Sequence, residues 1–467
     1  HAADEAAQLN VGALERRLDL VDVAVNVAHL LRLLVQPGGR VDGELLRGGT
    51  LHLGPVQPPP AVLLHLLANL ANTESLPPLS AVHVHHGLQA AADAWPAHCQ
   101  STCDSLGVPL RVMRVQVQPG ASLGRAARDA RYQVFTEVTG AGEVLLTGQH
   151  RDDQAETLLF RLLRGAGVRG LAAMPVQRSL AAGYLVRPLL DVPRAELEAY
   201  AEAHQLTWIE DPSNADSRFS RNYLRHRVLP VLAARWPQAN SNLARTAEHL
   251  NEAQALLDEL AQMDLQAANQ PSPFPWLHLP SLSLTPLREL SDARQRNALR
   301  HWLTPLTRLP DSDHWASWYS LRDAKGDAQP QWRLADGELH RSVERIWWLP
   351  STWSEFSDAT VSWPDPQNPL ELPGNGQVKL TGRIPGGPLT IRYRQGGEIL
   401  AVPGRGRRDL KRLLNESGLP GCVRGRLPLL YQGEQLLGAP SLAGLWPAPS
   451  DDWQLHWMPQ TCDQGLS

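Results

Sequence analysis

Residues 143–157 read Glu143-Val144-Leu145-Leu146-Thr147-Gly148-Gln149-His150-Arg151-Asp152-Asp153-Gln154-Ala155-Glu156-Thr157, and this stretch decides the fold. Its first five residues are a short apolar run, which predicts a buried strand. Leucines then recur at helical spacing until Gly165, which predicts a helix that ends at this glycine. A strand that turns directly into a helix places the turn at the carboxyl edge of an open sheet, where such folds bind their ligands.

Three carboxylates stand at the start of the predicted helix. Asp152 and Glu156 are four residues apart and Asp153 and Glu156 are three apart, so these side chains share one helix face. Carboxylates crowded at the end of a strand suit an ammonium ligand or a divalent cation. Acidic residues in a first helical turn also complement the helix dipole without any ligand, so residues elsewhere must decide between the two interpretations.

Composition narrows the class of protein. A chain of 467 residues is too long for one core and predicts two to four domains. No apolar run is long enough to span a bilayer, no signal-peptide pattern is present, and Cys99, Cys103, Cys422 and Cys462 are too few for a disulfide framework. We therefore expect a cytoplasmic protein. The first residue is His rather than Met, which indicates that the true start is missing, processed or replaced.

Strands and helices alternate from residue 62 onwards, and this predicts an α/β fold with a parallel, doubly wound (Rossmann-like) sheet. We expect this domain at residues 61–232, after an atypical segment at 1–60. The period then becomes helical, which predicts a mainly helical middle domain at 233–350 with a hairpin that turns at Asp336-Gly337. A Pro- and Ser-rich linker at 351–375 leads to a small α+β domain at 376–460.

Five motifs, at residues 81–88, 125–135, 145–167, 185–190 and 208–232, occur in an order that resembles the tRNA(Ile)-lysidine synthetase family of PP-loop ATP-pyrophosphatases. The resemblance covers roughly residues 62–460. It implies that ATP adenylates the wobble cytidine of an isoleucine tRNA, and that the amine of L-lysine then displaces AMP. It also implies Mg²⁺ as a cofactor, a monomer or homodimer, and no membrane partner.

The resemblance assigns roles to particular residues. Expected catalytic residues are Arg128, Arg131, Asp152, Asp153 and Glu156, and no metal ligand is assigned. His150, Asp153 and Glu156 would bind lysine, and His86, Gly87 and Arg131 would bind ATP. Expected tRNA-binding residues are Arg221, Asn222, Arg225 and Arg227 in the first domain and Arg407, Arg408, Lys411 and Arg412 in the last.

Local charge supports the second tRNA-binding group. Residues 392–426 contain nine basic and three acidic residues, whereas the whole chain has a net charge of −4. Such a local basic patch is typical of phosphate binding. Helical spacing of Arg408, Lys411 and Arg412 predicts that these side chains project together, although a solvated arginine face would have the same pattern.

The chain departs from the family at the PP-loop itself. The family motif, Ser-Gly-Gly-x-Asp-Ser, presents backbone N–H groups to pyrophosphate. The corresponding residues here are Pro55-Val56-Gln57-Pro58-Pro59-Pro60, and Gly124 stands where the family usually has Glu. Either this is a catalytically inactive tRNA-binding relative, or the amino-terminal sequence is foreign or mis-assigned. A PP-loop tRNA thiolase is the alternative enzyme, but thiolases use clustered cysteines, and this chain has no Cys-x-x-Cys.

Overall fold

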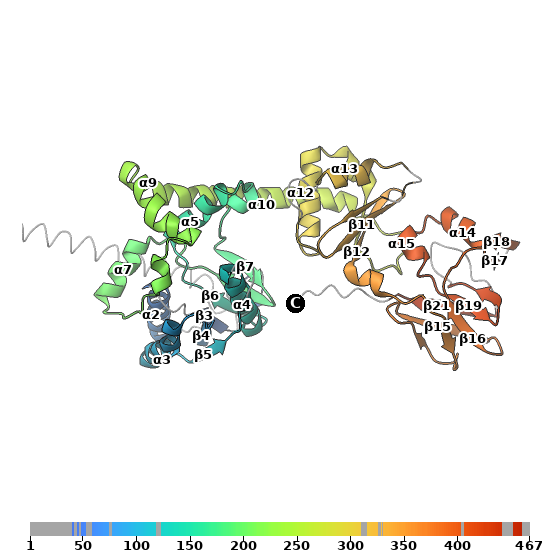
Figure 1. Cartoon of the computed structure of the whole chain (residues 1–467), viewed down its shortest axis with the longest axis horizontal. Helices are drawn as coiled ribbons and strands as arrows, with labels where there is room; N and C mark the ends of the chain where they lie inside the picture. Colours follow the sequence, from blue (N-terminus) through green and yellow to red (C-terminus); the bar gives the residue numbers. More distant parts are fainter. Residues whose placement is uncertain are drawn as a thin grey trace, which may run out of the picture. The chain divides into compact units, whose positions relative to one another are not determined.

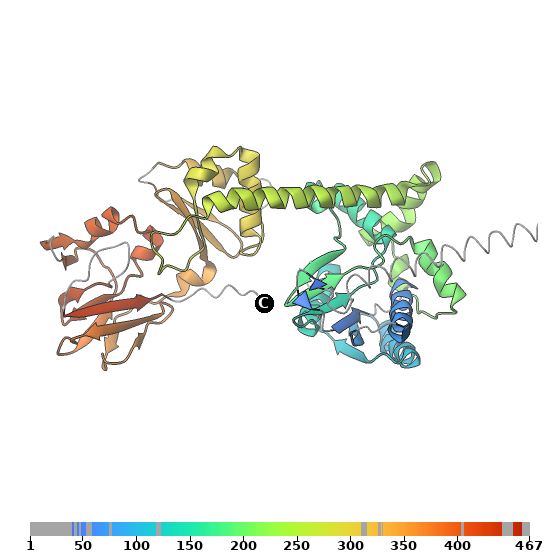
Figure 2. The ribbon, with the colours of Figure 1, turned by 180° about the vertical axis from the view of Figure 1, so that it is seen from behind.

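The structure is a computed structural model that describes residues 40–41, 44–45, 48–52, 58–73, 77–117, 123–309, 315–325, 328, 330–402, 406–440 and 452–459. The chain divides into two compact units between Ala255 and Leu256. This point lies inside α10 (Ala239–Ala268), the long helix in Figure 2. Within the described ranges, no helix is both long and apolar enough to cross a membrane. The cytoplasmic setting stays a prediction.

The first unit contains a six-stranded sheet in the order β5-β4-β3-β6-β8-β7. Strands β5, β4, β3, β6 and β8 run parallel, and β7 pairs antiparallel with β8 at the edge. The predicted parallel sheet is therefore confirmed, with an antiparallel edge strand that was not predicted. The bounds are β3 Gly48–His52, β4 Leu79–His85, β5 Leu110–Arg114, β6 Glu143–Leu146, β7 Gln177–Leu180 and β8 Gly183–Val186.

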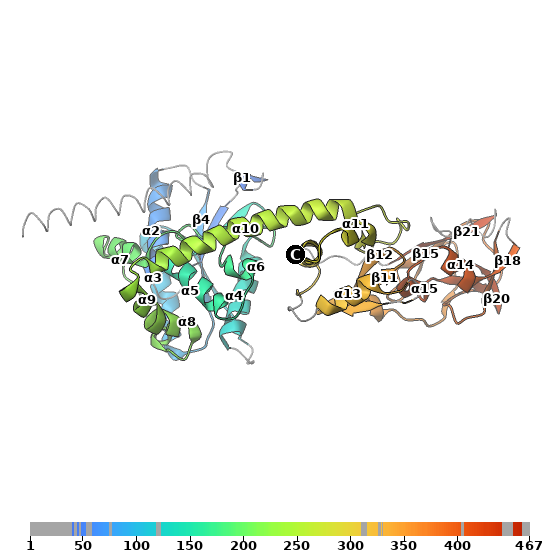
Figure 3. The same cartoon turned by 90° about the horizontal axis from the view of Figure 1, so that it is seen from above.

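Helices cover both faces of this sheet, as the doubly wound pattern predicts. Helices α2 (Pro58–Thr73), α3 (Trp95–Leu106) and α7 (Arg194–Ala203) pack on one face, in a core that includes Val144 and Leu146 of β6. Helix α4 (Leu123–Val138) packs on the other, against Leu145 of the same strand. Figures 1 and 3 show α2 and α3 on one side of the strands and α4 on the other.

Strand β3 occupies a central position between β4 and β6, and Leu51 is fully buried there. These residues belong to the segment 1–60, which was predicted to lie outside the sheet domain. The sheet therefore begins earlier than residue 61. Two further short strands, β1 (Arg40–Val41) and β2 (Glu44–Leu45), pair with each other, whereas residues 1–39 lie outside the described part of the chain.

The second unit begins with helices and an antiparallel sheet in the order β10-β11-β12-β9. The predicted hairpin is present, because β10 pairs with β11 across Asp336 and β11 pairs with β12. Trp332, Leu339 and Trp348 are buried in this core. The bounds are β9 Ser281–Ser283, α11 Leu284–Glu289, α12 Asp292–Leu303, α13 Trp315–Asp323, β10 Gln331–Arg333, β11 Gly337–Ser342 and β12 Arg345–Pro350.

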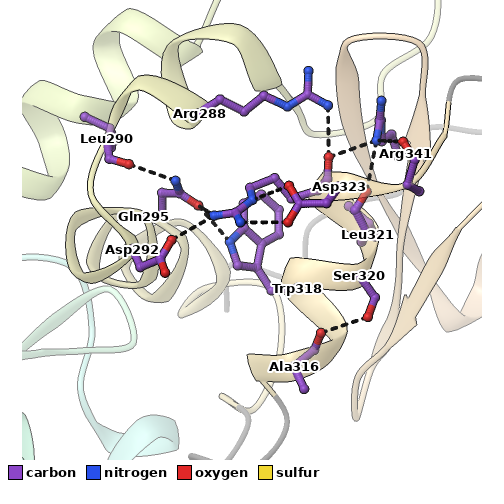
Figure 4. A network of polar contacts seen from close by, with 12 residues as sticks. Arg288, Leu290, Asp292, Gln295, Ala316, Trp318, Ser320, Leu321, Asp323 and Arg341 are labelled. Carbon is purple, nitrogen blue, oxygen red and sulfur yellow. Dashed lines mark hydrogen bonds and ion pairs between the residues drawn. The ribbon is translucent and has the colours of Figure 1, made fainter.

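A polar network fastens α12 to α13 (Figure 4). Gln295 accepts a hydrogen bond from Trp318 Nε1 at 3.1 Å and donates one to the carbonyl of Leu290 at 2.9 Å. Arg322 donates to Asp292 at 2.8 Å and to Asp323 at 2.7 Å. Since each of these donors finds an acceptor, this network stabilises the helix pair.

The carboxyl-terminal part is rich in β-structure. Its sheets have the orders β13-β16-β19-β20, β14-β15-β21 and β17-β18. Trp353, Trp363 and Leu372, which fall in the predicted linker, are buried in its core, so that segment packs as part of the domain. The bounds are η5 Ser351–Glu355, β13 Val361–Trp363, β14 Leu370–Glu371, β15 Gln377–Gly382, β16 Leu389–Arg392, β17 Ile399–Val402, β18 Gly406–Asp409, α14 Leu410–Glu416, α15 Gly421–Arg424, β19 Leu429–Gln432, β20 Gln435–Gly438 and β21 Trp453–Met458.

Candidate active site

The strand order reverses between β3 and β6, and this reversal locates the site. From β3 the chain adds β4 and β5 on one side of the sheet, and then returns to add β6 on the other. Ligands of open α/β sheets bind at the carboxyl ends of the strands at such a switch point. The turn that follows β6 contains Gly148, where an added Cβ would lie 3.0–3.2 Å from backbone atoms of Pro59 and Pro60. Gly148 thus allows the starts of α2 and α5 (Arg151–Leu162) to approach closely.

A cavity of about 340 Å³ opens at this point. Most of its lining is polar, and its charged residues are four arginines and two aspartates. This balance favours an anionic ligand such as a nucleotide or RNA phosphate. The lining consists of His52, Pro60, Arg128, Arg131, Tyr132, Phe135, Gly148, Gln149, Asp153, Asp211, Asn214, Arg221, Asn222 and Arg225.

Two of the predicted carboxylates meet an arginine inside the site. Arg225 Nε lies 2.6 Å from Glu156 Oε1, and its Nη2 lies 3.1 Å from Asp153 Oδ1. Burial, and to a lesser extent Asp153, raise the pKa of Glu156 against the lowering effect of Arg225. Burial alone would lower the pKa of Arg225, but its bonds to Glu156 and the charge of Asp153 raise it. The position predicted for a lysine ammonium is therefore occupied by a guanidinium, and only Asp153 of the two carboxylates lines the cavity.

Asp152 serves a different purpose from Asp153. Its carboxylate accepts hydrogen bonds from the backbone N of Arg194 at 2.9 Å and from Asn240 Nδ2 at 2.7 Å. It therefore ties the starts of α7 and α10 to α5, and it does not line the cavity. Burial opposes its ionisation, but the contact with His150 and the hydrogen bond from the backbone N of Arg194 outweigh this effect and lower its pKa well below the usual range.

His150 is also outside the cavity lining. Its ring is fully buried, with Nδ1 3.7 Å from Asp152 and Nε2 3.3 Å from Asp153. Its backbone N–H donates to Asp153 Oδ2 at 3.2 Å, which holds that carboxylate at the helix start. His150 thus holds Asp153 in place, and neither His150 nor Asp152 lines the cavity.

Arg131 connects the cavity to His86. Its Nε lies 3.5 Å from His86 Nε2, and Arg131 itself lines the cavity. Burial first, and then the charge of Arg131, lower the pKa of His86 to about 4, so the imidazole is neutral at pH 7. Gly87 follows at the end of β4 with a left-handed φ of +64°, which favours glycine. His86 and Gly87 do not line the cavity, but His86 contacts Arg131, which does.

Arg128 lies one helical turn before Arg131 on α4. Its guanidinium stacks over the ring of Tyr132, 4.8 Å from the centroid, and Nη2 lies 3.3 Å from the hydroxyl. Arg128, Arg131 and Tyr132 all line the cavity. The predicted common face of the two arginines is therefore turned toward the site.

The segment of residues 211–228 brings Arg221, Asn222 and Arg225 to the same cavity. Arg221 Nη2 donates to Thr157 Oγ1 of α5 at 2.6 Å, and Asn222 Nδ2 donates to the carbonyl of Ser213 at 2.8 Å. Arg227 is exposed and does not line the cavity. The elements here are η2 Pro212–Ala215, α8 Ser220–Tyr223, the π-helical segment η3 Leu224–Val228 and α9 Leu229–Arg235.

Helix α2 begins at the place where the family has its PP-loop. Its first three residues are Pro58, Pro59 and Pro60, and Pro60 lines the cavity. The first N–H groups of a helix are free to bind an anion, but proline has none to donate. The helix start thus points at the cavity without its usual phosphate donors. Residues 55–57, the first half of the segment that corresponds to the PP-loop, lie outside the described ranges.

The second predicted tRNA-binding group lies in the other unit and differs from the prediction in its secondary structure. Arg407 and Arg408 belong to strand β18, and only Lys411 and Arg412 belong to helix α14. The predicted helix therefore starts later, because Asp409 accepts from the backbone N of Arg412 at 2.9 Å and caps it. All four basic residues are exposed, and Arg412 pairs with Glu416 at 3.0 Å.

Not every basic residue of this region is available to a ligand. Arg426 is buried, with its guanidinium 4.0 Å from the ring centroid of Trp353 and its Nε bonded to Asn375. Arg392 pairs with Glu434 at 3.0 Å. Arg405 lies outside the described residues. The local excess of positive charge therefore overstates the exposed basic surface.

Several cavity residues had no predicted role. His52 lies in the segment that had no readable pattern, and its role as the last residue of β3 follows only from the tertiary pairing. Tyr132, Asp211 and Asn214 lie inside the quoted motifs but received no role. Asp211 accepts from Gln89 Nε2 at 2.9 Å and from the backbone N of Ser213 at 2.8 Å, so it joins the loop after β4 to the 211–228 segment.

Comparisons with known proteins agree with this geometry. Three family models match: a PP-loop domain at residues 60–232, a TilS substrate binding domain at 282–347 and a TilS substrate C-terminal domain at 389–457. A tRNA(Ile)-lysidine synthase of Pseudomonas fluorescens is 65% identical over 87% of this chain and 92% of its own length. The synthase of Pseudomonas aeruginosa is 63% identical over the same shares, and that of Escherichia coli O157:H7 is 40% identical over 81% and 88%.

Among solved structures, a U34-tRNA thiolase of Methanococcus maripaludis aligns with 50% of this chain and 80% of its own, at 17% identity and a TM-score of 0.40. This likeness carries no argument about function. The parallel sheet, the cavity at its switch point and the domain match define the first unit as a PP-loop domain of the kind that uses ATP. The agreement with curated relatives across most of the chain goes further. The chain belongs to the tRNA(Ile)-lysidine synthase family.

Proposed function

We propose that the active site of this protein is built to attach L-lysine, with ATP, to the wobble cytidine of an isoleucine tRNA, and that its proline-rich helix start limits this reaction. One observation supports this proposal most: in the family's PP-loop domain, Arg128, Arg131, Arg221 and Asp153 line the same cavity. A set of arginines suits the phosphates of ATP and the RNA, and a carboxylate suits the ammonium of lysine. Both reactants of a C–N ligation therefore find complementary charge in one place.

In this proposal Arg128 and Arg131 stabilise the negative charge that develops on the phosphates while the base is adenylated. Neutral His86 holds Arg131 in position through the 3.5 Å contact between Nε2 and Nε. The aromatic rings of Tyr132 and Phe135 add an apolar wall against which a base can pack. His86 and Gly87 then lie beside the nucleotide, at the end of β4.

Asp153 binds the side-chain amine of lysine in this proposal, and Glu156 acts on that pocket indirectly, through Arg225. Asp153 faces the cavity, whereas Glu156 is buried behind it and bonded to Arg225. Since Arg225 partly neutralises both carboxylates, an ammonium placed beside Asp153 is held less strongly than by free carboxylates. This arrangement favours loss of its proton, which must precede attack on the adenylated base.

Mg²⁺ has no site of its own among the described residues, because no three His, Cys, Asp or Glu side chains cluster there as ligands. The cavity carboxylate Asp153 is already bonded to Arg225. The donor set therefore does not fit a resident metal ion, and any Mg²⁺ would take its ligands from ATP and water.

The other domains contact the tRNA body in this proposal. The exposed residues Arg407, Arg408, Lys411 and Arg412 contribute positive charge to that contact. Arg227 is exposed as well, on the first unit. Contacts of this kind read the shape and phosphates of RNA rather than its sequence.

Thiol chemistry is disfavoured as the alternative. Cys99 and Cys103 are buried, and burial raises their pKa values to about 12 and about 11. Burial also raises the pKa of Cys422 to about 12. Thiols with such pKa values are poor nucleophiles and poor sulfur carriers at neutral pH. Cys462 lies outside the described residues.

The test uses a loop-restored variant with the six changes Pro55→Ser, Val56→Gly, Gln57→Gly, Pro58→Leu, Pro59→Asp and Pro60→Ser. This variant is incubated with ATP, labelled lysine and an isoleucine tRNA transcript, and the nucleosides are analysed by mass spectrometry. Lysine should appear on the wobble cytidine. A transcript with uridine at the wobble position is the control and should remain unlabelled. Label elsewhere in the tRNA, or none in either transcript, would contradict the proposal.

A further inference from the structure

A second basic pocket lies next to the active-site cavity in the first unit. It has a volume of about 270 Å³, and four arginines line it: Arg128, Arg161, Arg178 and Arg187. They come from α4, the end of α5, strand β7 and the segment after β8. Arg128 and Tyr132 line both this pocket and the active-site cavity, so the two spaces share a wall.

The charge of this pocket is not balanced by the protein. Asp129 is the acidic residue of the lining, and it lies 3.6 Å from Arg125. Arg161 and Arg187 each use Nη1 to donate to backbone carbonyls, Arg161 to Gly170 and Arg187 to Pro175, both at 2.7 Å. These bonds orient the guanidinium groups but do not neutralise them.

Arg187 carries the strongest signal of a missing ligand. It is only 3% exposed, and its Nε has no hydrogen-bond partner among the described residues. A buried donor without an acceptor is costly, and such groups usually mark a site that a ligand or ion completes. Burial is the main cause that lowers the pKa of Arg187, the charges of Arg178 and Arg128 lower it further, and Tyr132 opposes them.

Tyr132 fixes the geometry between the two spaces. The guanidinium groups of Arg128 and Arg178 lie 4.8 and 5.0 Å from its ring centroid. Stacking on the ring limits the rotamers of both arginines, so their N–H groups are pre-organised for an oxyanion. Planar guanidinium groups in such a set match the oxygens of a phosphate better than those of a small carboxylate.

We propose that this pocket binds a phosphodiester of the tRNA anticodon loop, next to the nucleotide whose base enters the active-site cavity. The proposal rests on the proposed function, since it is the shared wall of Arg128 and Tyr132 that places the phosphate beside the modified base. Arg178 and Arg187 donate to the phosphate oxygens, and Arg161 supplies additional charge. The pocket thereby positions the wobble cytidine. Free phosphate or pyrophosphate has the same chemistry, and the test must separate these sources.

The test measures binding of an anticodon stem-loop RNA without lysine or ATP, so it does not depend on turnover. Arg178→Gln removes one pocket arginine, which contacts Tyr132 and has a long hydrogen bond of 3.4 Å to the carbonyl of Ser179. Arg164→Gln is the matched control, because Arg164 is exposed, stacks only on Phe160 and lies outside the pocket lining. Arg178→Gln should weaken RNA binding about 10- to 100-fold, while the control should change it less than about threefold.

A double-mutant cycle identifies the phosphate. A neutral methylphosphonate replaces the phosphate on the 5′ or the 3′ side of the wobble cytidine. At one of these positions the effects of Arg178→Gln and of the neutral linkage should not add, because both remove the same contact. Additive effects at both positions would overturn the proposal.

Two further measurements separate a phosphodiester site from a general charge effect and from a site for free phosphates. Arg187→Lys should bind RNA as weakly as Arg178→Gln while it keeps the charge, because lysine cannot reproduce the fork of donors. Unchanged RNA binding by both variants would refute the pocket. Equal weakening of pyrophosphate binding, with no coupling to the methylphosphonate, would assign the pocket to free phosphates. Coupling between Arg178→Gln and the methylphosphonate, with no lysine transfer by the loop-restored variant, would support the pocket and contradict the proposed function.

Discussion

Asp153 provides the sharpest test of the lysine pocket. Among the three carboxylates at the start of α5, that of Asp153 lines the cavity. It accepts hydrogen bonds from Arg225 through Oδ1 at 3.1 Å and from the backbone N of His150 through Oδ2 at 3.2 Å. In Asp153→Asn, the side chain can still accept one of these bonds, so the fold should be preserved. The variant lacks the charge that attracts the lysine ammonium.

The expected magnitude follows from the removal of one charged hydrogen bond. Such a bond is worth about 1.5–3 kcal/mol, which corresponds to about 10- to 100-fold in binding. In the loop-restored protein, Asp153→Asn should therefore raise the KM for lysine by this factor and leave the KM for ATP within about threefold. Glu156→Gln should also raise the KM for lysine, because it frees Arg225 to compete for Asp153.

The assay is the initial rate of lysine incorporation, with lysine and ATP varied in turn. Asp152→Asn provides the comparison, since it makes the same change one residue away on a carboxylate that does not line the cavity. A rise in the KM for ATP with an unchanged KM for lysine would refute the placement of the amine at Asp153.

Three more predictions concern the basic surface, Asp152 and His86. Replacement of Arg407, Arg408, Lys411 and Arg412 by Ala should weaken tRNA binding. The slope of the logarithm of the binding constant against the logarithm of the salt concentration should become shallower by about 0.7 to 0.9 for each phosphate that the variant no longer neutralises. An unchanged slope would mean that these residues form only a solvated face. Asp152→Asn should lower the free energy of unfolding at pH 7 by about 1–3 kcal/mol. Because the pKa of Asp152 is lowered in the folded protein, the difference in stability between variant and unaltered protein should shrink as the pH falls below about 4. A difference that persists in acid would contradict this role of Asp152. The imidazole of His86 should titrate near pH 4 by NMR, and Arg131→Gln should raise that pKa only part of the way to 6.5, because burial is the larger cause; a pKa near 6.5 in the unaltered protein would show that the ring is solvated.

Local patterns in the sequence were sufficient for most of the first unit. The apolar run at 143–146 and the leucines after it predicted β6 and α5, and Gly107 caps α3 in a left-handed conformation. Helix α5 ends at Leu162, before the predicted Gly165, which is left-handed in the turn that follows. These features depend on neighbouring residues, so periodicity and capping can reveal them. Strand β3 was not predicted, because its five residues include two glycines and have little local strand pattern. Only the pairing with β4 and β6 makes them a strand.

The contacts that define the site are non-local. Arg225 and Glu156 are 69 residues apart in sequence, and nothing in either motif indicates that they pair. The arginines of the second basic pocket come from four separate segments. The carboxyl-terminal helix was predicted to include Arg408, although Asp409 followed by an apolar residue is a helix-start signal that could have placed the boundary correctly. Sequence reasoning therefore identified the residue types of the site more reliably than their partners.

The central claim is that this cavity performs lysine ligation and that its proline-rich helix start limits pyrophosphate binding. The most direct measurement compares the unaltered chain with the loop-restored variant in ATP-dependent incorporation of labelled lysine into an isoleucine tRNA transcript. Each missing donor to a developing phosphate charge costs about 2.7–4 kcal/mol, so the unaltered chain should bind tRNA but incorporate lysine below detection, and the variant should recover turnover. Robust incorporation by the unaltered chain would contradict the account, because another segment would then have to bind the pyrophosphate.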